Sequence, residues 1–140
     1  VLGSQAEQCK SLFPFPIYPM NYVSNEKELV DIYNAVDLYV TPSLQDNLPN
    51  TIVEAMACGI PCVGFNVGGI PQMIDHLHNG YVAQYKSADD LANGICWTLT
   101  EGDYETLSSE AYRKAVTTYS EATVASQYIQ IYNHITGKNA

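Results

Sequence analysis

Basic residues are scarce in this sequence: only six of its 140 residues are Lys or Arg, against fifteen Asp and Glu, which gives a formal net charge of −9. Without a basic run, the chain lacks the charge that neutralises a phosphate backbone, so nucleic-acid binding is excluded. No apolar stretch approaches the roughly 20 residues that a membrane span needs, and the N-terminus lacks the pattern of a signal peptide. The sequence therefore predicts a cytoplasmic protein without a transmembrane segment.

Cysteine is also rare. The four cysteines are too few and too scattered to hold a chain of this length together, so we expect reduced thiols. The neighbouring imidazoles of His76 and His78 are not followed by a third ligand at metal-binding spacing, and no metal site is expected. What the sequence does contain is 46 % hydrophobic residues, which is enough for one packed domain.

The apolar residues alternate between strand and helix patterns. Strands are expected at 38–41, 61–65 and 81–83, with a helix at 51–58 between the first two. Such alternation predicts an α/β fold with a Rossmann-like parallel sheet, right-handed crossovers and flanking helices. We expect Asn50 to cap the 51–58 helix.

Helices alone are expected in the last third of the chain. Ser87 and Ser120 are typical N-caps, and each is followed by an apolar stripe at helical spacing. These stripes are interpreted as core packing, and no chemistry is assigned to them. The sequence thus predicts a single domain over residues 1–140 that ends in a helical C-terminal third.

Glu54 is the most informative residue, because it lies in a helix that is apolar nearly all round, where an unpaired carboxylate is costly. Asp46 lies eight residues earlier, in the loop after a predicted strand. Ligands bind outside the carboxyl ends of parallel strands, so both acids are expected to face one cleft and accept hydrogen bonds from ligand hydroxyls. The alternative is a structural Glu54 that is compensated by the dipole of its own helix.

The stretch Asp-Asn-Leu-Pro-Asn-Thr-Ile-Val-Glu-Ala-Met-Ala-Cys-Gly-Ile-Pro at 46–61, followed by Gly68-Gly69, resembles the donor-binding region of family-four retaining glycosyltransferases. The likeness covers most of the chain and weakens after about Ala92. It implies a two-domain GT-B architecture, in which this chain is most of the C-terminal, nucleotide-sugar-binding domain. The N-terminal acceptor domain and the first strand–helix unit of the C-terminal domain would then be absent from this chain.

The resemblance also implies roles for individual residues. Asp46 would contact hydroxyls of the donor sugar, Glu54 the ribose hydroxyls, and the main chain of Asn47 and Leu48 the sugar or distal phosphate. No catalytic residue is assigned. The remaining expected substrate contacts are Tyr22 and Val23, whose main chain would lie against the nucleobase, and Asn50 and Thr51 at the helix N-terminus.

Three features depart from the family pattern. Asp46 stands where the wider family often has Glu, and Gln72 stands where an acid is frequent. The family holds the diphosphate with an upstream Arg and Lys, whereas residues 1–26 contain only Lys10. We therefore expect the 140-residue chain to be inactive by itself.

The resemblance implies that the full-length protein transfers a sugar from a nucleotide-diphosphate sugar to an acceptor hydroxyl with retention, as in polysaccharide or glycoconjugate synthesis. No metal or other cofactor is expected. The acceptor would be a glycan or a lipid, and any contact with a membrane surface would be made through the missing domain. Two alternatives remain open: a non-catalytic nucleotide- or sugar-binding module, and a GT-B nucleotide-sugar epimerase.

Overall fold

The computed structural model describes residues 1, 3 and 6–137, and the chain forms two compact units, residues 1–35 and 36–140. The smaller unit holds the 3₁₀ helix η1 (Ala6–Ser11) and helix α1 (Glu26–Asn34). The side chain of Asn25 caps α1, because its Oδ1 accepts hydrogen bonds from the amides of Lys27, at 2.9 Å, and Glu28, at 3.3 Å.

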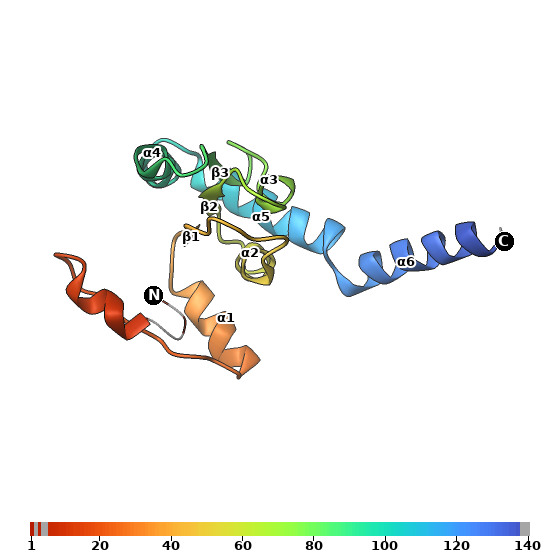
Figure 1. Cartoon of the computed structure of the whole chain (residues 1–140), viewed down its shortest axis with the longest axis horizontal. Coiled ribbons are helices and arrows are strands. Elements are labelled where there is room, and N and C mark those ends of the chain that lie inside the picture. Colours follow the sequence, from red (N-terminus) through yellow and green to blue (C-terminus); the bar gives the residue numbers. More distant parts are fainter. Residues whose placement is uncertain (2, 4–5, 138–140) are drawn as a thin grey trace. The chain divides into compact units, whose positions relative to one another are not determined.

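The larger unit is built on a three-stranded parallel sheet, which confirms the predicted α/β architecture (Figure 1). Its strands lie in the order β1 (Tyr39–Thr41), β2 (Cys62–Phe65) and β3 (Gly80–Ala83). All four residues of the central strand β2 are buried, as expected for an apolar strand that is covered on both faces. Val63 of β2 lies opposite Val40 on one side and Tyr81 on the other.

Helices cover this sheet and make up the whole last third of the described chain, as predicted. Helix α2 (Asn50–Ala57) packs on β2 and on α5 (Tyr104–Thr118), and helix α4 (Ala88–Thr100) packs on β2 and β3. No helix of the described residues is both long and apolar enough to cross a bilayer. The remaining helices of this unit are α3 (Ile70–Met73) and α6 (Glu121–Thr136). The expectation that the apolar stripe after Ser120 packs in the core is wrong, because α6 has no buried residue and Tyr128, Ile131 and Ile135 are exposed.

The start of α2 corrects one prediction. Asn50 does not cap the helix but is its first residue, and the N-cap is Pro49, which makes no side-chain capping bond. The extended backbone of Pro49, with φ −66° and ψ 116°, suits the N-cap position, and its missing N–H costs nothing there. The other end of α2 is as expected, since Gly59 follows it in the left-handed conformation with φ +74°.

The outer edge of β3 is covered by His76. The amide of Val82 donates a hydrogen bond to His76 Nδ1 at 3.1 Å, and His76 also forms an isolated bridge with Gly80. The imidazole packs edge-on against the ring of Tyr81, with 4.5 Å between the ring centroids. The Val82 amide and the Gly80 carbonyl, which accepts from the Leu77 amide at 2.8 Å, therefore find partners within the chain.

Asp90 joins β3 to the first turn of α4. Its carboxylate accepts hydrogen bonds from the amide of Gln84, at 2.6 Å, and from the hydroxyl of Tyr81, at 2.9 Å. These two bonds hold the pKa of the Asp90 carboxyl below its usual value. The predicted N-cap Ser87 completes the junction, because its Oγ accepts from the Asp90 amide at 3.2 Å.

This junction predicts an acid-sensitive part of the stability. A lowered pKa means that the ionised Asp90 stabilises the fold above the ordinary aspartate value of about 3.9, and that this contribution is lost as the pH falls through the lower folded value. The Asp90→Asn variant should be destabilised at pH 7, by no more than about 1 kcal/mol because the site is partly exposed to solvent. The difference from wild type should shrink below about pH 4 in chemical unfolding.

The neighbouring residue Asp89 provides a matched control, because it is exposed on the same helical turn and Asp89→Asn removes the same charge. The control should show a smaller loss of stability at pH 7. If Asp90→Asn lowers the free energy of unfolding by the same amount at pH 3 and at pH 7, the stabilising role of the ionised Asp90 carboxylate is contradicted.

Candidate functional site

The carboxyl ends of the three strands lie at one edge of the sheet, as in any parallel arrangement. Each strand is followed by a connection that begins at this edge. We call these connections the β1–α2 loop (residues 42–49), the β2–α3 loop (66–69) and the β3–α4 loop (84–87). The β1–α2 loop contains Asp46, Asn47 and Leu48, the central part of the predicted site.

The β2–α3 loop fits against the main chain of the β1–α2 loop without room for a side chain. A Cβ atom on Gly68 would lie 1.7 Å from the carbonyl oxygen of Asp46, and one on Gly69 would lie 1.9 Å from the carbonyl oxygen of Asn47. Gly68 also has φ +55°, which favours glycine. The Gly68-Gly69 pair therefore sets the backbone position of Asp46 and Asn47.

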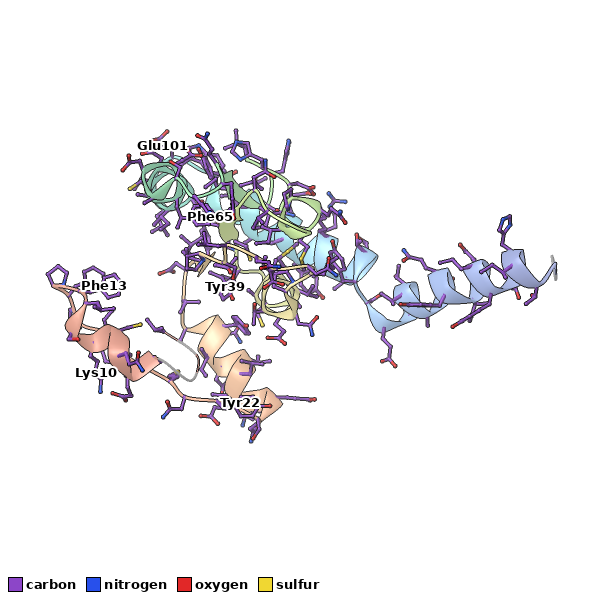
Figure 2. The ribbon with its side chains drawn as sticks, in the orientation of Figure 1. Lys10, Phe13, Tyr22, Tyr39, Phe65 and Glu101 are labelled. Atoms are coloured by element: carbon purple, nitrogen blue, oxygen red, sulfur yellow. The ribbon has the colours of Figure 1, made fainter. Side chains whose placement is uncertain are left out.

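Tyr39 stands at the start of β1 beside helix α2 (Figure 2). Its hydroxyl donates a hydrogen bond to Thr51 Oγ1 at 2.8 Å, which joins the strand to the first turn of α2. Burial raises the pKa of the Tyr39 hydroxyl, and the carboxylates of Glu54 and Asp46 raise it further. Both carboxylates are therefore close enough to the Tyr39 hydroxyl to act on it electrostatically.

Glu54 occupies a half-buried position on α2, one turn beyond Thr51. The helix is less completely buried than its composition indicates: Ile52, Ala55 and Met56 face the core, and Glu54 lies at its border. Burial raises the pKa of the Cys58 thiol, and the Glu54 carboxylate raises it further. A carboxylate at such a border is accessible to a ligand without paying the full cost of burial.

The other predicted contact residues divide between the two units. Asn47, Leu48 and Asn50 are exposed in the larger unit, and Asp46 is half-buried. Tyr22, which is exposed, and Val23 lie in the unit of residues 1–35, so their part in the site stays a prediction. Within the described residues, no three His, Cys, Asp or Glu side chains gather closely enough to hold a metal ion.

Tyr39 is the residue that sequence reasoning missed. In the sequence it is one of several apolar and aromatic residues of a short strand, and nothing in that pattern distinguishes it from core packing. Its hydroxyl becomes informative only when the fold brings it to Thr51, within electrostatic range of Asp46 and Glu54.

Comparison with known proteins agrees with this arrangement. The family described as "Glycosyl transferases group 1" matches residues 4–101, which include the whole parallel sheet and all of α4. The chain belongs to this family. The expectation drawn from the 46–61 stretch is thereby confirmed at the level of the family.

Curated relatives of this group 1 chain are much longer than the chain itself. N-acetyl-alpha-D-glucosaminyl L-malate synthase of Bacillus anthracis is 28 % identical over 79 % of this chain and 29 % of its own length. An N,N'-diacetylbacillosaminyl-diphospho-undecaprenol alpha-1,3-N-acetylgalactosaminyltransferase of Campylobacter jejuni is 27 % identical over 91 % of this chain and 34 % of its own length. The chain thus spans about a third of these relatives.

Solved structures show the same fold. Sucrose-phosphate synthase from Thermosynechococcus elongatus superposes with a TM-score of 0.81 and 22 % identity, over 96 % of this chain and 34 % of that chain. Anabaena Alr3699/HepE, in complex with UDP-glucose, superposes with a TM-score of 0.77 and 21 % identity, over 95 % of this chain and 40 % of that chain. The group 1 chain therefore has the fold of part of a GT-B glycosyltransferase.

The contact between the two loops can be tested with Gly69→Ala. The added methyl group meets a backbone carbonyl, which cannot move without displacing Asn47, so the variant should lose about 1–3 kcal/mol in the free energy of unfolding. Gly102→Ala is the control, because its nearest neighbour, at 2.7 Å, is the end of the Leu107 side chain rather than backbone. Chemical unfolding should show the larger loss for Gly69→Ala, and equal losses would contradict the tight contact.

Proposed function

We propose that this chain is the nucleotide-sugar-binding part of a retaining glycosyltransferase, which transfers a sugar from a nucleotide-diphosphate sugar to an acceptor hydroxyl. The observation that carries the proposal is the position of Asp46 and Glu54 in the loop and the helix that follow β1 at the carboxyl edge of the sheet, where Gly68 and Gly69 fit against the main chain of Asp46 and Asn47. Membership of group 1 supports it, as does the fold shared with a protein that was solved in complex with UDP-glucose.

The two carboxylates suit a ligand that is rich in hydroxyl groups. An ionised carboxylate accepts hydrogen bonds and donates none, so its natural partners are the hydroxyls of a sugar and of a ribose. Asp46 lies in the β1–α2 loop and is assigned to the donor sugar, whereas Glu54 lies inside α2 and is assigned to the ribose. Neither residue is assigned as a nucleophile.

The diphosphate is assigned to the main chain at the start of α2. The helix dipole and the amides of residues 47–51 favour an anion there, although Pro49 contributes no N–H. No metal is needed in this scheme. Catalysis rests on the orientation of the donor and on stabilisation of the leaving diphosphate by these dipoles and by basic side chains.

The basic side chains must come largely from elsewhere in the protein. Between residues 36 and 137 the sequence has three, and two of them pair with acids: Arg113 with Glu110, and Lys114 with Asp75 at 2.6 Å. We assign the missing charge, together with the acceptor glycan or lipid, to parts of the full-length protein outside this chain. A cytoplasmic location, with membrane contact through those parts, belongs to the same proposal.

Replacement of Glu54 tests the site in the full-length protein. Titration calorimetry with UDP, GDP and their sugars should show binding to wild type, and Glu54→Ala should weaken the binding at least about ten-fold, because a hydrogen bond to a charged group contributes roughly 1.5–3 kcal/mol. Glu105→Ala, at an exposed position near the start of α5, removes the same charge and should bind as wild type does.

A second variant separates binding from folding. Leucine is similar in size to glutamate but apolar, so the Glu54→Leu variant should fold with little loss of stability and still fail to bind nucleotides and nucleotide sugars. If Glu54→Ala binds every nucleotide as wild type does, the donor site is wrong. If Glu54→Leu fails to fold, a structural role for Glu54 is favoured instead.

Activity of the isolated chain provides a further test. Residues 1–140 should fail to transfer sugar from any nucleotide sugar that the full-length protein uses, because the acceptor site and most of the cationic phosphate contacts are assigned elsewhere. Release of nucleotide and formation of product are measured with both proteins at equal concentration. Turnover by the isolated chain above the uncatalysed background would overturn this part of the proposal.

A further inference from the structure

Tyr85, in the β3–α4 loop, reaches across the edge of the sheet to the β1–α2 loop. Its hydroxyl donates a hydrogen bond to the carbonyl oxygen of Leu44 at 3.1 Å, although the two residues lie 41 positions apart in the chain. Tyr85 is 43 % exposed, so its ring contributes little to the core. The hydroxyl contact is therefore the distinctive interaction of this side chain.

The backbone around Tyr85 is anchored on both sides. The Gln84 amide donates to Asp90 Oδ2 at 2.6 Å, and the Ser87 amide donates to the Gln84 carbonyl at 3.0 Å, which closes a turn. Within this turn Lys86 adopts a left-handed conformation with φ +62°, which is uncommon for a side chain of this kind. The Lys86 ammonium lies over the Tyr85 ring, 5.0 Å from its centroid.

The β1–α2 loop is thus held from two directions. Gly68 and Gly69 fit against the main chain of Asp46 and Asn47, and Tyr85 holds the carbonyl of Leu44, two residues before Asp46. The glycine contact limits how closely the β1–α2 loop can approach the β2–α3 loop. The Tyr85 hydrogen bond limits how far Leu44 can move away from the β3–α4 loop. Together they restrict the position of Asp46 and of the amides that follow it.

We propose that Tyr85 is a positioning residue for donor binding: its hydroxyl holds the β1–α2 loop where Asp46, Asn47 and Leu48 meet the sugar and distal phosphate of a nucleotide-diphosphate sugar. This inference rests on the proposed function of the same loop. Tyr85 acts through Leu44 and does not itself touch the donor. The nucleoside end of the donor is assigned to Glu54, inside α2, and does not depend on Tyr85.

The proposal predicts a selective defect in Tyr85→Phe, which removes only the hydroxyl. The full-length variant should bind nucleotide sugars roughly three- to ten-fold more weakly, the effect of one lost hydrogen bond. Binding of the matching nucleoside monophosphate, which lacks the distal phosphate and the sugar, should not change. Titration calorimetry measures the affinities for UDP-glucose, UDP-N-acetylglucosamine and GDP-mannose and compares them with the affinities for UMP and GMP.

Tyr119→Phe is the matched control. The Tyr119 hydroxyl also donates to a distant main-chain carbonyl, that of Gln72, at 3.3 Å across 47 positions, but it lies at the end of α5 and not in a loop at the carboxyl edge. This control should bind nucleotide sugars as wild type does. Both variants should retain the melting temperature of wild type within about 2 °C, since each loses one partly exposed hydrogen bond.

Hydrogen exchange tests the loop contact without any nucleotide. Amides of residues 43–48 should exchange several-fold faster in Tyr85→Phe than in wild type or Tyr119→Phe, because the beginning of the loop has lost its anchor. Unchanged exchange in this segment overturns the proposal, whatever the nucleotide titrations show.

The binding outcomes distinguish this proposal from the function on which it rests. If Glu54→Ala loses nucleotide binding and Tyr85→Phe keeps full affinity for nucleotide sugars, the role of Tyr85 is wrong and the donor site stands. Equal weakening toward monophosphates and nucleotide sugars also overturns the positioning role. Absence of any nucleotide binding by wild type overturns both the donor site and the role of Tyr85.

Discussion

The arrangement of the candidate site depends on one steric constraint: two main-chain segments touch where no Cβ atom fits. Gly68 and Gly69 bring the β2–α3 loop against the carbonyls of Asp46 and Asn47. Because peptide groups are stiff, a contact between backbones places a loop more firmly than a contact between mobile side chains. The contact fixes the main chain of Asp46 and Asn47, just before α2, while the packing of α2 on β2 and α5 places Glu54.

Much of the fold is predictable from sequence because the three strands are short apolar segments between strong turn residues. A strand that is buried on both faces reads as a continuous apolar run, as residues 61–65 do, and Gly59 supplies the left-handed end of α2 that the sequence predicts. The helix cap was predicted wrongly at Asn50, since capping propensity favours Asn while the chain places Pro49 there with suitable dihedral angles.

The candidate site is only partly predictable. Glu54 stands out because a charged residue is conspicuous in an apolar helix, and Asp46 because it lies eight residues earlier in the loop after a strand. In the structure both carboxylates act electrostatically on the Tyr39 hydroxyl. Tyr39 and Tyr85 do not stand out, since a tyrosine in a strand or a loop is common and its hydroxyl partner lies 12 or 41 residues away. Contacts at such separation are set by the topology of the sheet and leave no local pattern in the sequence.

The imidazole that covers β3 has a consequence for the behaviour of the sheet in solution. Parallel strands with free outer amides act as templates on which another polypeptide can add a strand, and this is a common beginning of aggregation. His76 accepts a hydrogen bond from the outward amide of Val82 and forms a bridge with Gly80. These two positions of β3 are therefore not available for pairing with a strand of another molecule. His76 thus protects this edge of the sheet from pairing with the sheet of another copy of the group 1 chain.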